Sequence, residues 1–159
     1  MLIEMTVRRR HQLALLALLA APLCGLRAFA ALGGDAVSVA ADANELGATV
    51  ATTPMQRYEL MTISADNGLR LREYATLGGQ VFAVTWQGPF EPDLRRLLGA
   101  QYPAYTRAVA ALQRPGLQRS LRIVLPTLVV DLAGHLRAYS GRAYLPSLVP
   151  AGVTPAQLH

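Results

Sequence analysis

The 159-residue sequence contains no lysine, one tryptophan and one cysteine, and these shortages exclude several kinds of site. The cysteine is Cys24, within an apolar N-terminal stretch, so the rest of the chain can form neither an internal disulfide nor a thiolate metal site. Histidine is also scarce, and only His135 and His159 follow that stretch. We therefore expect no metal site, no cofactor and no catalytic cysteine.

The absence of lysine means that every cationic side chain is an arginine. The planar guanidinium group binds carboxylate or phosphate through paired hydrogen bonds, so such a protein is suited to anionic ligands. The arginines are scattered along the chain, however, and alanine is abundant. Both features also follow from the coding bias of a GC-rich genome, and we favour that interpretation at this level.

Residues 1–30 have the layout of a secretory signal peptide. A basic segment at 8–11 precedes an apolar stretch over 13–24, and small residues follow. The apolar stretch is shorter than the roughly 20 residues of a membrane-spanning helix, which disfavours the alternative of an N-terminal anchor. We therefore expect cleavage between Ala30 and Ala31, no stable membrane span afterwards, and a periplasmic or secreted location.

The expected mature domain, residues 31–159, is much less basic than the whole chain. The full sequence has a formal net charge of +5, and removal of four arginines and one glutamate with the leader lowers it to +2. This weak excess does not indicate a surface for nucleic acid or for anionic membranes. The domain is long enough to bury a core without disulfides.

The first half of this domain shows strand periodicity between strong turn signals. Asn67-Gly68 and Gly78-Gly79 favour tight turns because glycine accepts a positive φ. These turns separate three segments that predict an antiparallel meander, namely residues 56–65, 69–77 and 80–87. Before the meander we expect a short helix over Val39–Leu46 and an irregular segment over 48–54.

The second half combines a helical region with further strands. Asp93 is suited to cap a helix, which Gly99 and Pro103 interrupt or divide into two. Seven apolar residues fall on one face of this region: Leu94, Leu97, Leu98, Tyr102, Tyr105, Val109 and Leu112. Strand-like segments follow at 121–125, 128–132 and 136–145, with a turn at Ala133-Gly134. Pro146, Pro150 and Pro155 indicate an extended tail, in which residues 154–157 could start one helical turn.

These elements predict an α+β domain. We expect an antiparallel sheet of about five strands, formed by the three-stranded meander and a C-terminal hairpin, with one main helix packed on one face.

The segment around Trp86 is the densest apolar constellation in the chain. Phe82, Val84 and Trp86 are expected on one strand face beside a Gly88-Pro89 corner. Aromatic side chains at such a corner can form a ligand groove, but a large core anchor beside a rigid strand exit is the more common arrangement. We favour the core assignment.

Polar residues on two strands are the other candidate binding features. Arg137 and Tyr139 are expected to share a strand face with Arg142 nearby, which suits an acidic or sugar ligand or, alternatively, a solvated outer face. Glu73 interrupts the apolar side of its strand, so either a bulge redirects it or it is a buried carboxylate with a partner. The candidate ligand-binding residues are Arg72, Glu73, Trp86, His135, Arg137, Tyr139 and Arg142.

A hydrolase would need a nucleophile with a base, and Ser140, His135 and Asp131 are the candidates. We expect His135 and Ser140 on one strand, five residues apart and therefore on opposite sides, which argues against a catalytic pair. The Gly-x-Ser-x-Gly elbow of many hydrolases is absent from the sequence. We therefore predict no catalytic residues.

Several stretches together resemble a known family. They are Ala31-Leu32-Gly33-Gly34, Arg72-Glu73-Tyr74, Val81 through Leu94, Leu97-Leu98-Gly99, Gly134 through Tyr139 and Gly141-Arg142-Ala143-Tyr144, with the Trp86-Gln87-Gly88-Pro89 corner the most specific. They resemble the small exported proteins of domain-of-unknown-function family 2844, from Gram-negative proteobacteria. The resemblance implies an exported protein and supplies no catalytic residues.

The sequence thus favours an exported, non-enzymatic binding or envelope-associated module. Its partner would be a protein or small molecule of the cell envelope rather than nucleic acid. The alternatives are a periplasmic hydrolase and an inhibitor of an exported enzyme, of which the latter rests on fold analogy alone.

Overall fold

The computed structural model describes residues 32–36, 43, 48–112 and 120–159. The expected signal peptide and its cleavage site between Ala30 and Ala31 lie outside the described residues. The expected helix over Val39–Leu46 also lies outside them, apart from Ala43.

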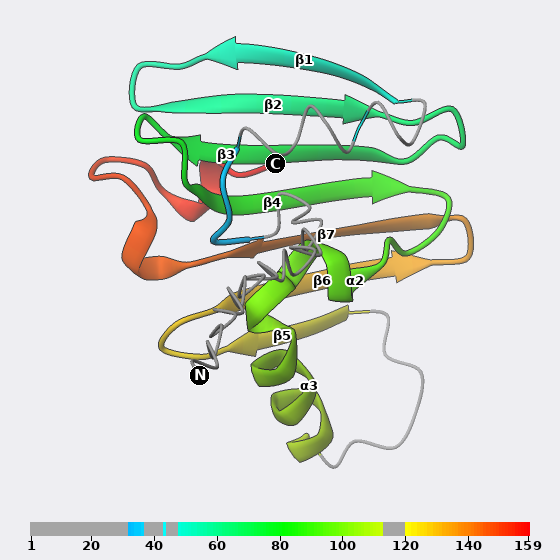
Figure 1. Cartoon of the computed structure of the whole chain (residues 1–159). Coiled ribbons are helices and arrows are strands. Elements are labelled where there is room, and N and C mark those ends of the chain that lie inside the picture. The colour runs from blue at the N-terminus through cyan, green and yellow to red at the C-terminus, as the bar shows by residue number, and fades with distance from the viewer. Residues whose placement is uncertain (1–31, 37–42, 44–47, 113–119) are drawn as a thin grey trace, which may run out of the picture.

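The described chain forms an antiparallel sheet in the order β1-β2-β3-β4-β7-β6-β5 (Figure 1). Its seven strands are β1 (Thr49–Pro54), β2 (Tyr58–Ser64), β3 (Arg70–Thr76), β4 (Val81–Gly88), β5 (Ser120–Val124), β6 (Val129–His135) and β7 (Ala138–Tyr144). The α+β class is confirmed, but the prediction of about five strands was too low. The segment expected to be irregular is edge strand β1, whose mostly exposed Thr- and Ala-rich sequence gives no apolar alternation.

The meander and the last three strands meet in the middle of the sheet. Strands β1 to β4 follow one another across the sheet. The hairpin between β2 and β3 has the expected Asn67-Gly68 turn, in which Gly68 has a φ of 86°. After the helices, the chain re-enters at the far edge as β5 and returns through β6 to β7. Strand β7 then pairs with β4, so the last strand of the sequence lies at an interior position.

The helical region is divided as the sequence suggests. It comprises α2 (Leu94–Leu98), a 3₁₀ turn η1 (Gly99–Gln101) and α3 (Tyr102–Ala111). Asp93 caps α2, because its Oδ1 accepts hydrogen bonds from the backbone N–H groups of Arg95 at 2.9 Å and Arg96 at 3.4 Å. The predicted cap and the division near Gly99 are therefore confirmed.

The main core lies between these helices and one face of the sheet (Figure 1). Leu97, Leu98 and Tyr105 are buried against the sheet, and the remaining residues of the predicted apolar stripe pack partly buried around them. Burial raises the pKa of the Tyr105 phenol, and the negative charge of Glu91 adds to the effect. The stripe therefore performs the packing role that its helical spacing predicted.

Trp86 belongs to this core and is only 3% exposed. Its indole lies over Gly141, the residue opposite it on β7: a Cβ placed there would be 2.3 Å from Trp86 Cζ2. Only glycine leaves room for the ring at that position. The core assignment of Trp86 is confirmed by this packing.

A register shift between β3 and β4 changes the facing of Phe82. Tyr74 pairs with Ala83, but Ala75 pairs with Val81, so Phe82 is the extra residue of a bulge. Phe82 consequently packs with Tyr74 on the sheet face opposite Trp86. The expectation that Phe82, Val84 and Trp86 share one face was therefore wrong for Phe82.

The bulge does not redirect Glu73, which stays on the helix side of β3. Its backbone pairs with Met61 and with Val84, and both neighbours belong to the main core. Glu73 is itself buried. Of the two alternatives, the structure therefore shows the buried carboxylate.

The second face of the sheet is partly covered by the C-terminal segment 145–159, which we call the tail. It contains two 3₁₀ turns, η2 (Pro146–Leu148) and η3 (Pro155–Gln157), the second with the capping residues Thr154 and Gln157. Val153 and Leu158 of the tail complete a smaller core with an apolar row of strand residues: Leu60, Tyr74, Ala83, Tyr144 and Val129. The helices therefore cover one face, as expected, and the tail covers part of the other.

Hydrogen bonds hold the tail in place along its length. The Tyr74 hydroxyl donates to the His159 carbonyl oxygen at 2.9 Å and accepts from the His159 N–H at 3.1 Å. Near the other end of the tail, Arg57 Nη1 donates to the Ala151 carbonyl oxygen. The tail is thus an integral layer of the domain.

Candidate functional site

The part of the second sheet face that the tail leaves uncovered is polar. One row across five neighbouring strands consists of Arg72, Thr85, Arg142, Asp131 and Arg122, each directly opposite the next. The adjacent row consists of Arg70, Gln87, Ser140, Ala133 and Ser120. We call these two rows the arginine face. They arise because alternate residues of each strand point away from the helix-covered core.

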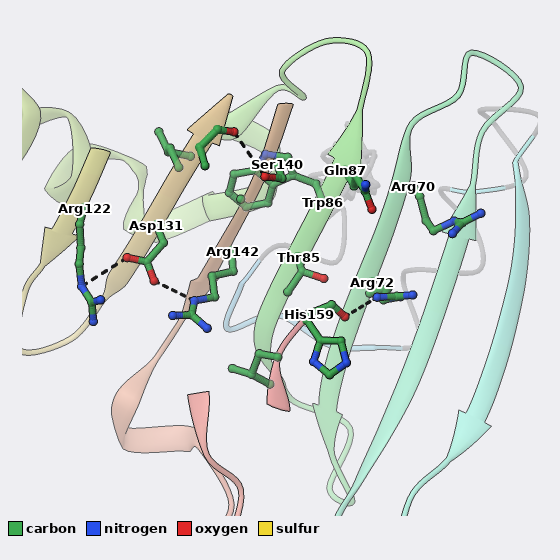
Figure 2. Close-up of a pocket in the computed structure, with 14 residues that line it drawn as sticks. Arg70, Arg72, Thr85, Trp86, Gln87, Arg122, Asp131, Ser140, Arg142 and His159 are labelled. Carbon is green, nitrogen blue, oxygen red and sulfur yellow. Dashed lines mark hydrogen bonds and ion pairs between the residues drawn. The ribbon is translucent and has the colours of Figure 1, made fainter. Parts of the chain in front are cut away.

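Asp131 links two arginines of the first row. Its Oδ2 accepts a hydrogen bond from Arg142 Nε at 2.8 Å, and its Oδ1 lies 3.3 Å from Arg122 Nε (Figure 2). The Arg142 side chain is 27% exposed, whereas that of Arg122 is 63% exposed. The shielded Arg142 pair is therefore the stronger contact, and Arg122 is held loosely.

Backbone carbonyl groups of the tail hold two arginines of the same row. Arg142 Nη1 donates to the Pro155 carbonyl oxygen at 2.7 Å, and Arg72 donates to the carbonyl oxygen of His159. Thr85 is buried and lies between these two arginines in the row (Figure 2). Arg72 and Arg142 are thus held on either side of a hydroxyl group, at the border between tail and open face.

A cavity of about 530 Å³ opens over this row. Among the described residues that line it, Arg70, Arg72, Arg122 and Arg142 face a single acidic side chain, Asp131. Arginines gathered in a concave site concentrate positive potential and favour carboxylate or phosphate groups. The excess of cationic side chains makes this cavity the candidate site of an anionic ligand.

A second cavity, of about 570 Å³, continues from the first toward the β6–β7 turn. The two cavities share four lining residues: Arg70, Gln87, Ala133 and Ser140. His135 and Arg137 lie at the far end of the second cavity. The two cavities are therefore adjacent on the arginine face, and we call them together the groove.

The structure corrects the predicted turn at this end of the groove. Strand β6 continues through Ala133-Gly134 to His135, and the turn consists of Leu136 and Arg137. Arg137 has a φ of 64°, a left-handed conformation that the sequence did not predict for it. Because Arg137 is a turn residue, the expectation that it shares a strand face with Tyr139 was wrong.

The same correction changes the argument about a hydrolase. Ser140 lies opposite Ala133 and His135 lies opposite Ala138, so the two occupy neighbouring strands rather than one strand. Both line the second cavity, so the expectation that they lie on opposite sides was wrong. The Ser140 hydroxyl is within 3.5 Å of the Ala133 carbonyl oxygen, and the Asp131 carboxylate is bound by two arginines. Asp131 is therefore engaged and does not serve to orient a histidine base.

The seven sequence-predicted site residues fall into three groups. Arg72, Trp86 and Arg142 contribute to the first cavity, and His135, Arg137 and Tyr139 to the second. Glu73 is buried on the helix side of the sheet, away from both. Prediction missed several polar residues of the groove, among them Arg70, Thr85, Gln87 and Arg122, although the alternation of Arg70 and Arg72 along their strand was a visible signal.

Two further observations concern the described part of the chain as a whole. It contains no group of three or more histidine, cysteine, aspartate or glutamate residues placed to hold a metal ion. Its helices all fall short of the length and apolarity required to cross a membrane.

The family model described as "Protein of unknown function (DUF2844)" matches residues 28–158. None of the curated proteins and none of the solved structures matches the chain.

Proposed function

Because this chain belongs to the DUF2844 family, whose function is unknown, we propose a function from the arginine face itself. The protein is a non-enzymatic binding module that holds an anionic ligand in the groove through carboxylate or phosphate groups.

The row from Arg72 to Arg122 is the observation that carries this proposal. Asp131 and the tail carbonyl of Pro155 fix the guanidinium of Arg142, and the His159 carbonyl fixes that of Arg72. Arginines held in advance lose less conformational entropy on binding, so more of each charge-assisted hydrogen bond contributes to affinity. The remaining N–H groups of these guanidiniums are the donors available to a ligand.

The site is expected to lose affinity when either fixed arginine is neutralised. We predict that Arg72→Gln and Arg142→Gln each weaken the binding of tripolyphosphate by about tenfold or more, because each removes hydrogen bonds to a charged ligand. Isothermal titration calorimetry at low ionic strength measures the effect, and added salt should reduce the wild-type affinity.

Arg107→Gln is the matched control for these two variants. Arg107 lies on α3, where its Nε donates to the Pro103 carbonyl oxygen, and it does not line the groove. This variant should bind tripolyphosphate as the wild type does. Equal losses in all three variants would reveal only a general charge effect and would refute a built site.

We also propose that the domain acts outside the cytoplasm, in the periplasm or as a secreted protein. The basic, apolar and small-residue segments of residues 1–30 support this location. Intact-mass measurement of protein from the native host should give a chain that begins at Ala31. A cytosolic species that still carries Met1 would contradict the proposal.

A further inference from the structure

Two arginines of the groove also bond the tail. Arg142 Nη1 donates to the Pro155 carbonyl oxygen at 2.7 Å, and Arg72 Nη1 donates to the His159 carbonyl oxygen (Figure 2 shows the second of these bonds). Both arginines line the first cavity, where their other N–H groups can reach a ligand. Each of these two guanidiniums therefore connects the tail with the site of the anion.

The carbonyl oxygen that holds Arg72 is itself held by Tyr74, two residues further along β3 and on the same sheet face. The Tyr74 hydroxyl donates to the His159 carbonyl oxygen at 2.9 Å and accepts from the His159 N–H at 3.1 Å. Tyr74 is 2% exposed and lines neither cavity. Its hydroxyl therefore acts on the groove only through the backbone of the tail.

The carbonyl oxygen that holds Arg142 belongs to the 3₁₀ turn η3. The Pro155 carbonyl also accepts a hydrogen bond from the Leu158 N–H at 3.2 Å, and the Thr154 N–H donates to Gln157 Oε1 at 2.7 Å. The Leu158 side chain is buried in the smaller core. The acceptor of Arg142 is thus fixed by a hydrogen-bonded turn with an apolar anchor.

We propose that docking of the tail and binding of the anion reinforce each other, and that Tyr74 is a positioning residue for the anion site. This inference rests on the proposed anion-binding function and adds the tail to the site. When the tail opens, Arg72 and Arg142 lose their acceptors and regain rotamer freedom, which a ligand then has to remove. By linkage, a ligand that prefers the docked state stabilises the docked tail by the same factor.

The contacts favour reinforcement over competition between tail and ligand. The tail carbonyls occupy one N–H group of Arg72 and one of Arg142, and Asp131 occupies a further N–H group of Arg142. A guanidinium carries more N–H groups than these bonds use. The tail therefore fixes the two arginines and leaves donors for the ligand.

Tyr74→Phe should weaken the binding of tripolyphosphate by about fivefold or more, in the lower range of couplings between sites. The substitution keeps the buried ring but releases the backbone of His159, and Arg72 then loses a fixed acceptor. Tyr144→Phe is the matched control. Tyr144 is buried in the same smaller core and lines neither cavity, whereas the bonds to His159 come from Tyr74. Calorimetry should give the wild-type affinity for this control.

Hydrogen exchange provides a readout that a purely structural role of Tyr74 would not change. Saturating tripolyphosphate should slow exchange of the Leu158 and His159 amides of the wild type by about fivefold or more, because the ligand opposes opening of the tail. The amides of edge strand β1, which open locally and lie outside the groove, should not respond. In Tyr74→Phe, the effect of the ligand on the tail amides should be smaller.

Failure of the coupling and failure of the proposed function give different results. If tripolyphosphate does not bind the wild type, the proposed anion-binding function is wrong. If it binds, but Tyr74→Phe keeps the wild-type affinity or the tail amides do not respond to the ligand, the function stands and the coupling is overturned. Tighter binding by Tyr74→Phe would show competition, and equal losses in Tyr74→Phe and Tyr144→Phe would show a general effect on the core. Either result would also overturn the coupling.

Discussion

Replacement of Trp86 with alanine should lower the free energy of unfolding by about 3–5 kcal/mol, the range for truncation of a large aromatic in a core. The indole is 3% exposed and fills the space over Gly141 between the sheet and the helices. Neighbouring strands β3 and β7 are hydrogen-bonded to β4 on both sides and cannot move inward to close the cavity. Urea denaturation followed by far-UV circular dichroism measures the loss.

Phe90 provides the matched control for this substitution. It belongs to the same corner of the chain but is 38% exposed. Phe90→Ala should therefore change stability much less than Trp86→Ala. Wild-type stability of Trp86→Ala combined with weakened binding of tripolyphosphate would show instead that Trp86 is a ligand-binding residue.

Leu158→Ala should lower the free energy of unfolding by about 2–3 kcal/mol, which is in the lower part of the range for truncation of a buried leucine. Leu158, a residue of the tail, is 2% exposed. It packs with Tyr74 and Phe82 of the sheet face that the tail covers. The expected loss of stability is at the lower end of this range because a tail segment can move to fill the cavity more easily than a central strand can. The same variant should make the tail more susceptible to limited proteolysis, since its main apolar anchor is lost.

Leu136→Ala is the control, because Leu136 is 85% exposed in the β6–β7 turn. The same chemical change there should alter the free energy of unfolding by less than about 0.5 kcal/mol. Equal effects at Leu136 and Leu158 would contradict the docked position of the tail.

Local signals in the sequence were sufficient for much of the fold. The Asn67-Gly68 turn, the Asp93 cap and the apolar stripe of the helices depend on neighbouring residues, and each is found where its pattern predicted. Strand β1 was missed because an edge strand is held by backbone hydrogen bonds on one side and needs no apolar alternation. The docking of the tail was missed because it depends on contacts between Leu158 and strands far away in the sequence.

The candidate site could be predicted from the sequence less completely than the fold. The alternation of Arg70 and Arg72 with apolar residues is visible in the sequence and agrees with the shared face that these arginines occupy. That Arg72, Thr85 and Arg142 lie directly opposite one another depends on strand register and on the order β3-β4-β7, and neither can be obtained from residue spacing. A turn displaced from residues 133–134 to 136–137 was enough to misplace Arg137 and to invalidate the geometric argument about Ser140.

The interior position of β7 also bears on when the chain can fold. Strand β4 has one open side until residues 138–144, which lie much later in the sequence, pair with it. The sheet therefore closes late, through contacts between distant parts of the chain, which are slow to form. Until that pairing forms, β4 presents a free sheet edge, the usual template for unwanted pairing with another chain.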